Sequence, residues 1–358
     1  MKIIHCADLH LDSRMETGLT KEKAKERRLE LLRTFTQMVE RGAAEGVDAV
    51  LLCGDLFDAR TISARARNCV LDAVREHPGM RFYYLQGNHD QNSFLSDLAE
   101  IPENLMTFGT DWTSYEEQDG VTITGAEITD ETADALTERL ILDAEGINIV
   151  MLHGQATEYG AKRQMEGFSL KKLKNRNINY LALGHIHSYR KERLDERGVW
   201  CYSGCLEGRG FDECGEKGYV LIEVKDGRLS GEFVPFACRR FHEVRVDVSN
   251  LLTQEEIQRA LHRELQEIPP TDAVKLVLTG ETAPEAEKDA AAIEKWLEND
   301  YYLLKVKDET RLAIHPEDYQ YDVSLKGEFV RLVLASRLSA ADKEQVLRLG
   351  IRALAGEE

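Results

Sequence analysis

Five short clusters of aspartate, asparagine and histidine stand out in the sequence, because these side chains bind divalent metal ions. Each cluster directly follows a short apolar run that is typical of a buried strand. Taken singly none is informative, since a lone DxH or HxH occurs by chance and a histidine after a strand is more often structural. The clusters are Asp8-Leu9-His10, Gly54-Asp55-Leu56-Phe57-Asp58, Gly87-Asn88-His89-Asp90, His153-Gly154 and Gly184-His185-Ile186-His187.

The placement of the five clusters together predicts one shared metal site. In open α/β sheets the loops leaving the carboxyl ends of the strands converge at one edge, so ligands far apart in the chain meet there. In extended backbone the imidazoles of His185 and His187 point in a similar direction, so each can bind a different ion. Glycines beside the ligands allow sharp turns and close approach. The mixed nitrogen and oxygen set suits Mn²⁺, Fe or Zn²⁺ and disfavours Ca²⁺, which prefers oxygen.

The elements that must position these clusters alternate between strands and helices along the first 240 residues. Such alternation favours an α/β fold with a sheet covered by helices on both faces. The predicted strands are Lys2–Ala7, Ala49–Cys53, Phe82–Gln86, Val121–Gly125, Ile147–Leu152 and Tyr180–Leu183, followed by the hairpin Gly218–Lys225 and Arg228–Pro235 around the turn signal Asp226-Gly227. The predicted helices are Thr20–Ala44, Ile62–Arg75, Asp130–Asp143 and Ser169–Arg176.

A second, smaller unit is predicted to begin near Arg240. Its helix Thr253–Gln266 opens with the capping box Thr253/Glu256. From about Ser324 onward, apolar residues at helical spacing predict two short amphipathic helices that need a surface to pack against. The remaining predicted elements of this unit are the strands Phe241–Val248, Ala273–Thr279 and Tyr301–Lys307 and the helix Pro284–Asn299.

Charge argues against a wholly basic nucleic-acid-binding domain. The chain has a formal net charge of −18; residues after 240 carry 15 basic and 24 acidic side chains, a net of −9, which leaves −9 for the first 240. Residues 162–193 depart from this, with nine basic and two acidic side chains, a net of +7. This run is either a solvated helix face and loop or, because it flanks the candidate ligands, a phosphate-binding surface.

Seven scattered cysteines fit reduced thiols better than a disulfide framework. Cys201, Cys205 and Cys214 lie close together but lack the CxxC pairs of structural zinc sites. The apolar runs are strand-sized, and the N-terminus lacks the pattern of a secretory signal. We therefore expect a cytoplasmic protein with no membrane-spanning segment.

Read in order, DxH, GDxxD, GNHD, HG and GHxH resemble the signature of calcineurin-like metallophosphoesterases. Within that superfamily the chain is similar to the SbcD-type DNA repair exonucleases, on the residues His5–Asp12, Tyr202-Ser203-Gly204 and the block Gly208–Tyr219. The resemblance covers about residues 1–240 and implies a four-layer αββα sandwich there. Residues 241–310 correspond in size and order to an α+β capping domain, and 311–358 to a C-terminal helical segment.

The resemblance also implies two divalent metal ions, with Mn²⁺ the expected metal, and seven ligands. The first ion takes Asp8, His10 and His187, the second takes Asn88, His153 and His185, and Asp55 bridges both. His89 is expected to contact the phosphate and assist the leaving oxygen, with Asp90 orienting its imidazole. Two sequence features depart from the family: Ala59–Ser63 lacks the expected proline, and Cys205 replaces a more usual serine.

The expected activity is that of a DNA nuclease, an exonuclease of DNA repair, in which a metal-bridging hydroxide attacks the phosphodiester. The alternative is a phosphodiesterase or phosphatase acting on nucleotides, cyclic nucleotides or phosphoproteins, which the acidic charge favours. A non-catalytic scaffold would require eroded ligands, and all seven are in place. The C-terminal helices, Leu325–Leu354, are expected either to dock an SMC-like coiled-coil ATPase, as the resemblance implies, or to pack on the parent domain; a homodimer is also open.

Overall fold

The structure of the protein is a computed structural model that consists of two compact units, Met1–Arg240 and Phe241–Glu358. Each unit is described by itself. The residues described are 1–15, 19–58, 62–87, 90, 94–95, 98, 100–128, 133–157, 167–283, 286–313 and 319–355.

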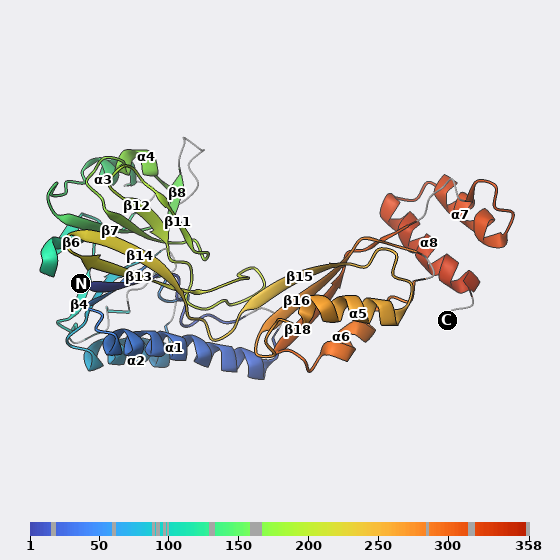
Figure 1. Ribbon diagram of the computed structural model, residues 1–358, viewed down its shortest axis with the longest axis horizontal. Helices are drawn as coiled ribbons and strands as arrows, with labels where there is room; N and C mark the ends of the chain where they lie inside the picture. Colours follow the sequence, from blue (N-terminus) through green and yellow to red (C-terminus); the bar gives the residue numbers. More distant parts are fainter. Residues whose placement is uncertain are drawn as a thin grey trace. The chain divides into compact units, whose positions relative to one another are not determined.

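Two six-stranded sheets stack face to face in the first unit, with helices on both outer faces (Figure 1). In the first sheet the order is β14-β13-β1-β2-β3-β4, and in the second it is β11-β12-β10-β7-β6-β5. The first sheet consists of β1 (Lys2–Cys6), β2 (Ala49–Cys53), β3 (Arg81–Leu85), β4 (Leu105–Thr107), β13 (Gly218–Lys225) and β14 (Arg228–Pro235). The second consists of β5 (Thr113–Glu116), β6 (Val121–Gly125), β7 (Ile147–His153), β10 (Tyr180–Gly184), β11 (Arg190–Arg193) and β12 (Val199–Tyr202).

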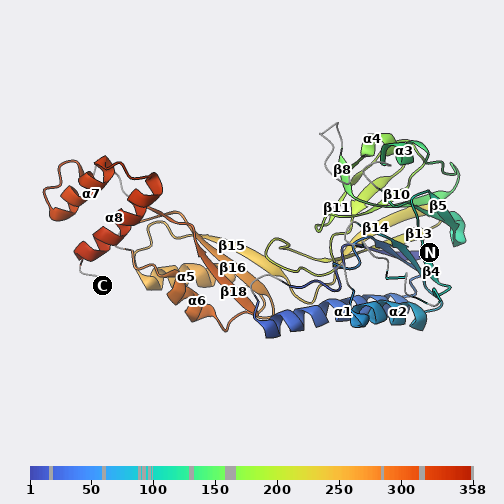
Figure 2. The ribbon, with the colours of Figure 1, turned by 180° about the vertical axis from the view of Figure 1, so that it is seen from behind.

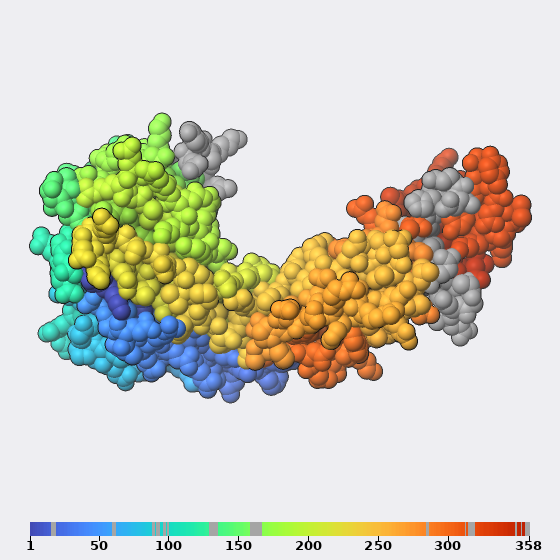
Figure 3. Space-filling view, viewed as in Figure 1, coloured from blue at the N-terminus to red at the C-terminus, as the bar shows by residue number. Residues whose placement is uncertain are grey.

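Continuous apolar runs form the central strands because both faces of each sheet are covered. In β1 the side chain of Ile3 enters the core between the two sheets, whereas its neighbour Ile4 enters the core beneath the helices. β1, β2, β3 and β4 are parallel, and β13 pairs antiparallel with β1. The β13–β14 hairpin forms the yellow surface between the blue helices and the green second sheet (Figure 3).

Helices complete the outer layers of the first unit. α1 (Lys21–Ala44) and α2 (Ala64–Glu76) lie against the first sheet, and α3 (Ala133–Glu138) and α4 (Leu170–Leu173) lie against the second. Seen from behind, the two pairs again lie on opposite sides (Figure 2). Thr20 and Ser63 cap α1 and α2 by accepting hydrogen bonds from backbone N–H groups. The predicted four-layer αββα sandwich is confirmed. A small pair, β8 (Gln155–Thr157) and β9 (Gly167–Ser169), and a 3₁₀ turn, Gln118–Gly120, lie outside the layers.

The second pair of helices is shorter than the sequence predicts. α4 ends at Leu173 because Asn175 and Asn177 take left-handed backbone conformations, with φ of 59° and 62°. α3 ends at Glu138, and Ile141, which lies within the predicted helix Asp130–Asp143, is outside α3 and 90% exposed. Asp130, the predicted start of that helix, lies outside the described residues.

A buried ion cluster ties α1 to the loop after β12. The Arg27 guanidinium, which is completely buried, donates to Glu207 Oε2 at 3.0 Å and to the carbonyl of Gly208 at 2.7 Å. Thr34 donates from its hydroxyl to Glu207 Oε1 at 2.8 Å. Glu207 is only 3% exposed, so its charge depends on these partners rather than on water.

We therefore predict that Arg27→Met lowers the free energy of unfolding by about 3–5 kcal/mol, because it leaves the Glu207 carboxylate buried without its cation. Urea unfolding of the full chain measures this. Arg33→Met, on the exposed side of the same helix, is the matched control and should change stability by less than about 0.5 kcal/mol. If both substitutions change the free energy of unfolding equally, the Arg27–Glu207 pair makes no specific contribution to stability.

The second unit combines a three-stranded parallel sheet with two helices on one face. The order is β15 (Phe241–Asp247), β16 (Ala273–Thr279), β18 (Leu303–Asp308). α5 (Gln254–Leu265) and α6 (Ala290–Leu297) pack on it, and the predicted Thr253/Glu256 capping box is present. α6 starts later than predicted because Asp289 caps it; the predicted start, Pro284, lies outside the described residues. Two short strands, β17 (Glu281–Thr282) and β19 (Arg311–Leu312), pair with each other.

Two helices, α7 (Leu325–Ala335) and α8 (Ala340–Ala355), end the chain. They pack on each other through Val330, Val333, Leu347 and Ile351. Within the described part of the chain, no helix combines the length and the apolar composition needed to cross a bilayer.

Candidate metal centre

The carboxyl ends of the central strands of both sheets meet at one place. In the first sheet Cys6 pairs with Leu52, and in the second His153 pairs with Gly184, so the strands end side by side. A Cβ on Gly184 would lie 1.9 Å from the Cys53 carbonyl oxygen, so the two sheets approach each other here with no room for a side chain. The loops leaving both sheets therefore open into a common space.

Unusual backbone conformations aim the candidate ligands into this space. Asp8, His10 and Asp55 have φ values of 51°, 44° and 52°, in the left-handed region that costs energy for residues other than glycine. Backbone hydrogen bonds hold the two loops together: Asp8 N–H donates to the Gly54 carbonyl and His10 N–H to the Asp55 carbonyl, both at 3.0 Å. Strain of this kind is found where a site requires a particular side-chain direction.

One group of candidate ligands consists of Asp8, His10 and His187, whose ligand atoms lie within 4.8 Å of one another. The Nε2 atoms of the two histidines face each other at 3.3 Å. On the other side of its ring, His187 Nδ1 lies 2.6 Å from Glu213 Oε1. A carboxylate only accepts, so this short contact, rather than the longer one of 3.3 Å to Arg209 Nη2, assigns a proton to Nδ1 and leaves Nε2 to face the site.

The second group consists of Asp8, Asp55 and His153, within the same limit. His153 Nδ1 faces the Cys53 carbonyl at 2.9 Å, which assigns the proton to Nδ1 and turns Nε2 toward Asp55 Oδ2 at 3.4 Å. Asp55 Oδ2 also lies 4.0 Å from His10 Nε2, between histidines of the two groups. The His185 ring lies beside His153, with centroids 5.6 Å apart, and its backbone N–H donates to Asp8 at 2.9 Å.

The pKa shifts of Asp8 and His153 indicate that this crowded site favours added positive charge. Burial raises the pKa of Asp8, and the neighbouring histidines oppose this shift. For His153, burial lowers the pKa, but the hydrogen bond and charge of Asp55, the charge of Asp8 and the Cys53 carbonyl raise it more, to about 9. Both shifts favour proton uptake where carboxylates and imidazoles crowd together. The residues present therefore fit divalent cations, which would supply the same positive charge.

The third predicted cluster is only partly described. Asn88 and His89, predicted as a ligand and as the residue assisting the leaving oxygen, lie outside the described residues, as does the loop 59–61 that departs from the family. Asp90 is described and buried, and its carboxylate accepts hydrogen bonds from the backbone N–H groups of Gly87 at 3.0 Å, Phe57 at 3.0 Å and Leu56 at 3.2 Å. Asp90 thus joins the loop after β3 to the loop that carries Asp55, and its predicted action on His89 stays a prediction.

Several charged residues around the centre were not predicted from the sequence. Arg209 donates to both oxygens of Glu213, and its Nη1 lies 3.2 Å from Asp58 Oδ2. Lys217 donates to the His187 carbonyl at 2.7 Å. One sequence signal could have identified them: Arg209 and Glu213 lie four residues apart in the block that carries the nuclease-like resemblance.

Other residues of this block support the loops around the site. The Tyr202 hydroxyl donates to the Gly154 carbonyl and accepts from Ala156 N–H, both at 2.8 Å. Cys205, at the position where serine is more usual, is a buried thiol whose Sγ lies 3.5 Å from the His187 carbonyl, and burial raises its pKa well above the usual value. All seven cysteines are free, and the candidate metal groups of the described residues contain none of them.

Several of the described basic residues in the run at 162–193 make structural contacts. Lys172 pairs with Glu138 at 2.9 Å, and Lys191 donates to the Gly231 carbonyl at 2.7 Å. Arg190 lies 5.0 Å above the Trp200 ring. Lys162 and Arg163 lie outside the described residues. These contacts favour the structural interpretation of the run over the phosphate-binding one.

A four-layer αββα sandwich with carboxylate and imidazole groups at its strand ends defines a metal-dependent phosphoesterase. The model of the calcineurin-like phosphoesterase family matches residues 1–189, more than half of the chain, and the chain belongs to this family of hydrolases. The predicted resemblance to calcineurin-like metallophosphoesterases is confirmed.

Three relatives illustrate the range of similar proteins. "Uncharacterized metallophosphoesterase YhaO" of Bacillus subtilis (strain 168) is 28% identical, over 80% of this chain and 73% of its own length. The SbcD component of the nuclease SbcCD of Escherichia coli (strain K12) is 22% identical over 100% of this chain and 99% of its own. "DNA double-strand break repair protein Mre11" of Methanosarcina acetivorans is 24% identical over 89% of this chain, which spans about half (52%) of that protein.

The close approach of the two sheets generates a prediction. Gly184→Ala should lower the free energy of unfolding by about 1–3 kcal/mol, because the new Cβ requires the backbone of Cys53 to move. It should also lower the content of tightly bound divalent metal, measured by elemental analysis. Gly79→Ala, where an added Cβ meets nothing within 4 Å, is the control. Wild-type stability and metal content in Gly184→Ala would contradict the packing argument.

Proposed function

We propose that the protein is a two-metal-dependent nuclease that hydrolyses phosphodiester bonds in DNA, as an exonuclease of DNA repair. The observation that carries this proposal is the pair of ligand groups that share Asp8 and have Asp55 between their histidines. Relatives named as a nuclease component and as double-strand break repair proteins support the choice of DNA.

In this proposal Asp8, His10 and His187 hold one divalent cation and Asn88, His153 and His185 the other, with Asp55 shared. Mn²⁺ is the proposed metal. Two such cations lower the pKa of a water molecule and neutralise charge on the phosphoryl oxygens. The chain's own contribution is orientation: the hydrogen bonds of Glu213 and the Cys53 carbonyl fix the tautomers of His187 and His153 so that Nε2 faces the site. His89 is the proposed proton donor to the leaving oxygen.

Asp55→Asn tests the proposal directly. Loss of an outer-shell partner typically costs ten- to a hundredfold in activity. Loss of a shared ligand charge should therefore lower Mn²⁺-dependent hydrolysis by more than about a hundredfold. The assay compares linear duplex DNA, single-stranded DNA and a small chromogenic diester, with Mn²⁺ or with a chelator. Unchanged turnover in Asp55→Asn would disprove the assigned site.

The same assay separates the alternative substrates. The net charge of −18 favours a small phosphoester, because an acidic protein repels a polyanion at low salt. If the protein hydrolyses the small diester but neither duplex nor single-stranded DNA, the proposed metal chemistry stands and DNA is not the substrate.

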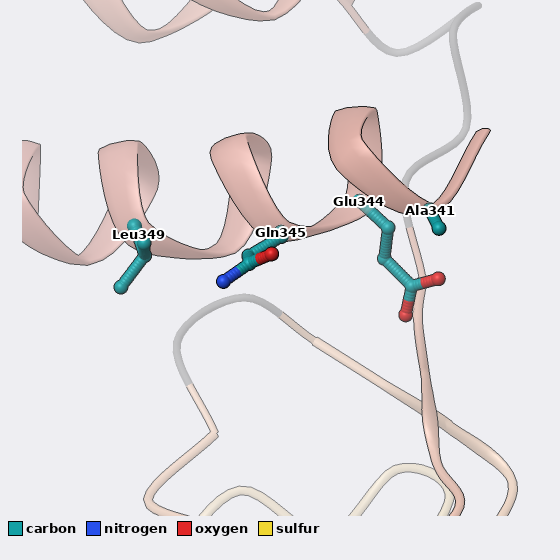
Figure 4. A pocket seen from close by; sticks show the side chains of 4 residues that line it. All are labelled: Ala341, Glu344, Gln345 and Leu349. Carbon is teal, nitrogen blue, oxygen red and sulfur yellow. The ribbon is translucent and has the colours of Figure 1, made fainter. Parts of the chain in front are cut away.

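We further propose that residues 241–310 cap the active site and that α7 and α8 dock an SMC-like coiled-coil ATPase. The described residues include 13 exposed large apolar side chains, and eight of these lie between Tyr321 and Leu354, which is an unusual concentration for a free surface. A pocket of about 400 Å³ lies on one side of α8, lined by Ala341, Glu344, Gln345 and Leu349 (Figure 4).

Leu332→Glu and Leu349→Glu test the docking proposal, because both side chains are more than 60% exposed and contribute little to the packing of α7 on α8. We expect each to abolish co-purification with a co-expressed SMC-like ATPase while hydrolysis of the small diester is unchanged. Ile141→Glu, an equally drastic change at an exposed position of the first unit, is the control. If the complex still forms with Leu332→Glu and with Leu349→Glu, this surface is not the docking site.

A further inference from the structure

The two candidate ligand groups differ in the hydrogen-bond partner of the histidine Nδ1, the ring nitrogen that faces away from the site. His153 Nδ1 faces a neutral backbone carbonyl, that of Cys53, at 2.9 Å. His187 Nδ1 faces the Glu213 carboxylate at 2.6 Å. A carboxylate accepts a stronger hydrogen bond than an amide carbonyl, and it makes the opposite ring nitrogen a better donor to a metal.

Glu213 is itself held in place by Arg209. The Arg209 backbone N–H donates to Oε2 at 2.7 Å, and the guanidinium donates to Oε1 from Nη2 at 2.7 Å and from Nε at 3.1 Å. The Glu213 side chain is only 4% exposed, so this fork and His187 replace water as its partners. The carboxylate therefore has little freedom to turn away from the imidazole.

The same guanidinium reaches the other histidine of this group. Arg209 Nη1 donates to Asp58 Oδ2 at 3.2 Å, and Asp58 Oδ1 lies 3.6 Å from His10 Nδ1. One arginine thus joins the carboxylates behind His187 and His10. Behind the His153 ring, the hydrogen-bond partner of Nδ1 is instead the Cys53 carbonyl, on the backbone of β2.

We propose that Arg209 and Glu213 are positioning residues that set the cation affinity of the Asp8–His10–His187 group, while the His153 group is independent of them. The proposal rests on the two-metal function proposed above. It predicts that the two cation sites respond unequally to a change at a residue that is not itself a ligand.

Glu213→Gln tests this, because glutamine keeps the size and an acceptor oxygen but removes the charge. Metal-free full-length protein is titrated with Mn²⁺ by calorimetry, and bound metal is counted after dialysis. Wild type should bind two equivalents. The variant should retain one site at wild-type affinity and bind the other about 10–100-fold more weakly. Arg209→Lys, which keeps the charge without the planar fork, should weaken the same site by less.

Glu117→Gln is the matched control, since Glu117 is also a largely buried carboxylate paired with an arginine, Arg81, but away from the centre. It should bind both equivalents as wild type does. Thermal unfolding of the metal-free variants checks folding, and Arg209→Lys serves if Glu213→Gln does not fold.

Two results would overturn the inference while leaving the two-metal function intact: unchanged binding in both the Glu213 and Arg209 variants, or an equal loss at both sites. Failure of wild type to bind Mn²⁺ would instead overturn the proposed function, and the inference with it.

Discussion

The candidate centre depends on the contact between the carboxyl ends of the two sheets. Gly184 and the Cys53 carbonyl leave no space for a side chain between them, so β2 and β10 are held at minimum separation. The residues that follow these strands, and those that follow β1 and β7, are then forced into one small volume. Asp8 illustrates the result, because it follows β1 and yet accepts a hydrogen bond from the backbone of His185, which follows β10 of the other sheet.

This crowding has an electrostatic consequence. Asp8 is 1% exposed and Asp55 is 2% exposed, so two neighbouring carboxylates are withdrawn from water. Without other positive charge, the site takes up protons, as the raised pKa values of Asp8 and His153 indicate. Divalent cations would supply positive charge to the same carboxylates. The buried carboxylates are thus stabilised by positive charge, and the positions of the carboxylate and imidazole lone pairs determine where a cation would bind.

The sequence predicted eight of the twelve strands of the two sheets, because these eight have local apolar patterns, whereas β4, β5, β11 and β12 were not predicted. The strands Ala49–Cys53 and Val121–Gly125 have the predicted limits, because short, largely apolar runs of this kind favour buried strands. The Arg209–Glu213 contact with His187 was not predicted, because it joins distant segments through polar residues that have no periodicity. β11, whose residues Arg190–Arg193 are all charged, is a strand only because it pairs with β12 at the edge of the sheet. Nothing local in its sequence indicates this.

The acidic character of the chain can be reconciled with a phosphodiester substrate through the same centre. The described basic residues near it are already engaged: Arg209 by Glu213 and Asp58, and Lys217 by the His187 carbonyl. Among the described groups at the common space, the carboxylates of Asp8 and Asp55 would repel phosphate. Under the proposed function, the attraction between protein and phosphate must then come mainly from bound cations rather than from arginine or lysine. Substrate binding and cation binding would therefore be coupled, and an acidic surface would be no obstacle once both cations are bound.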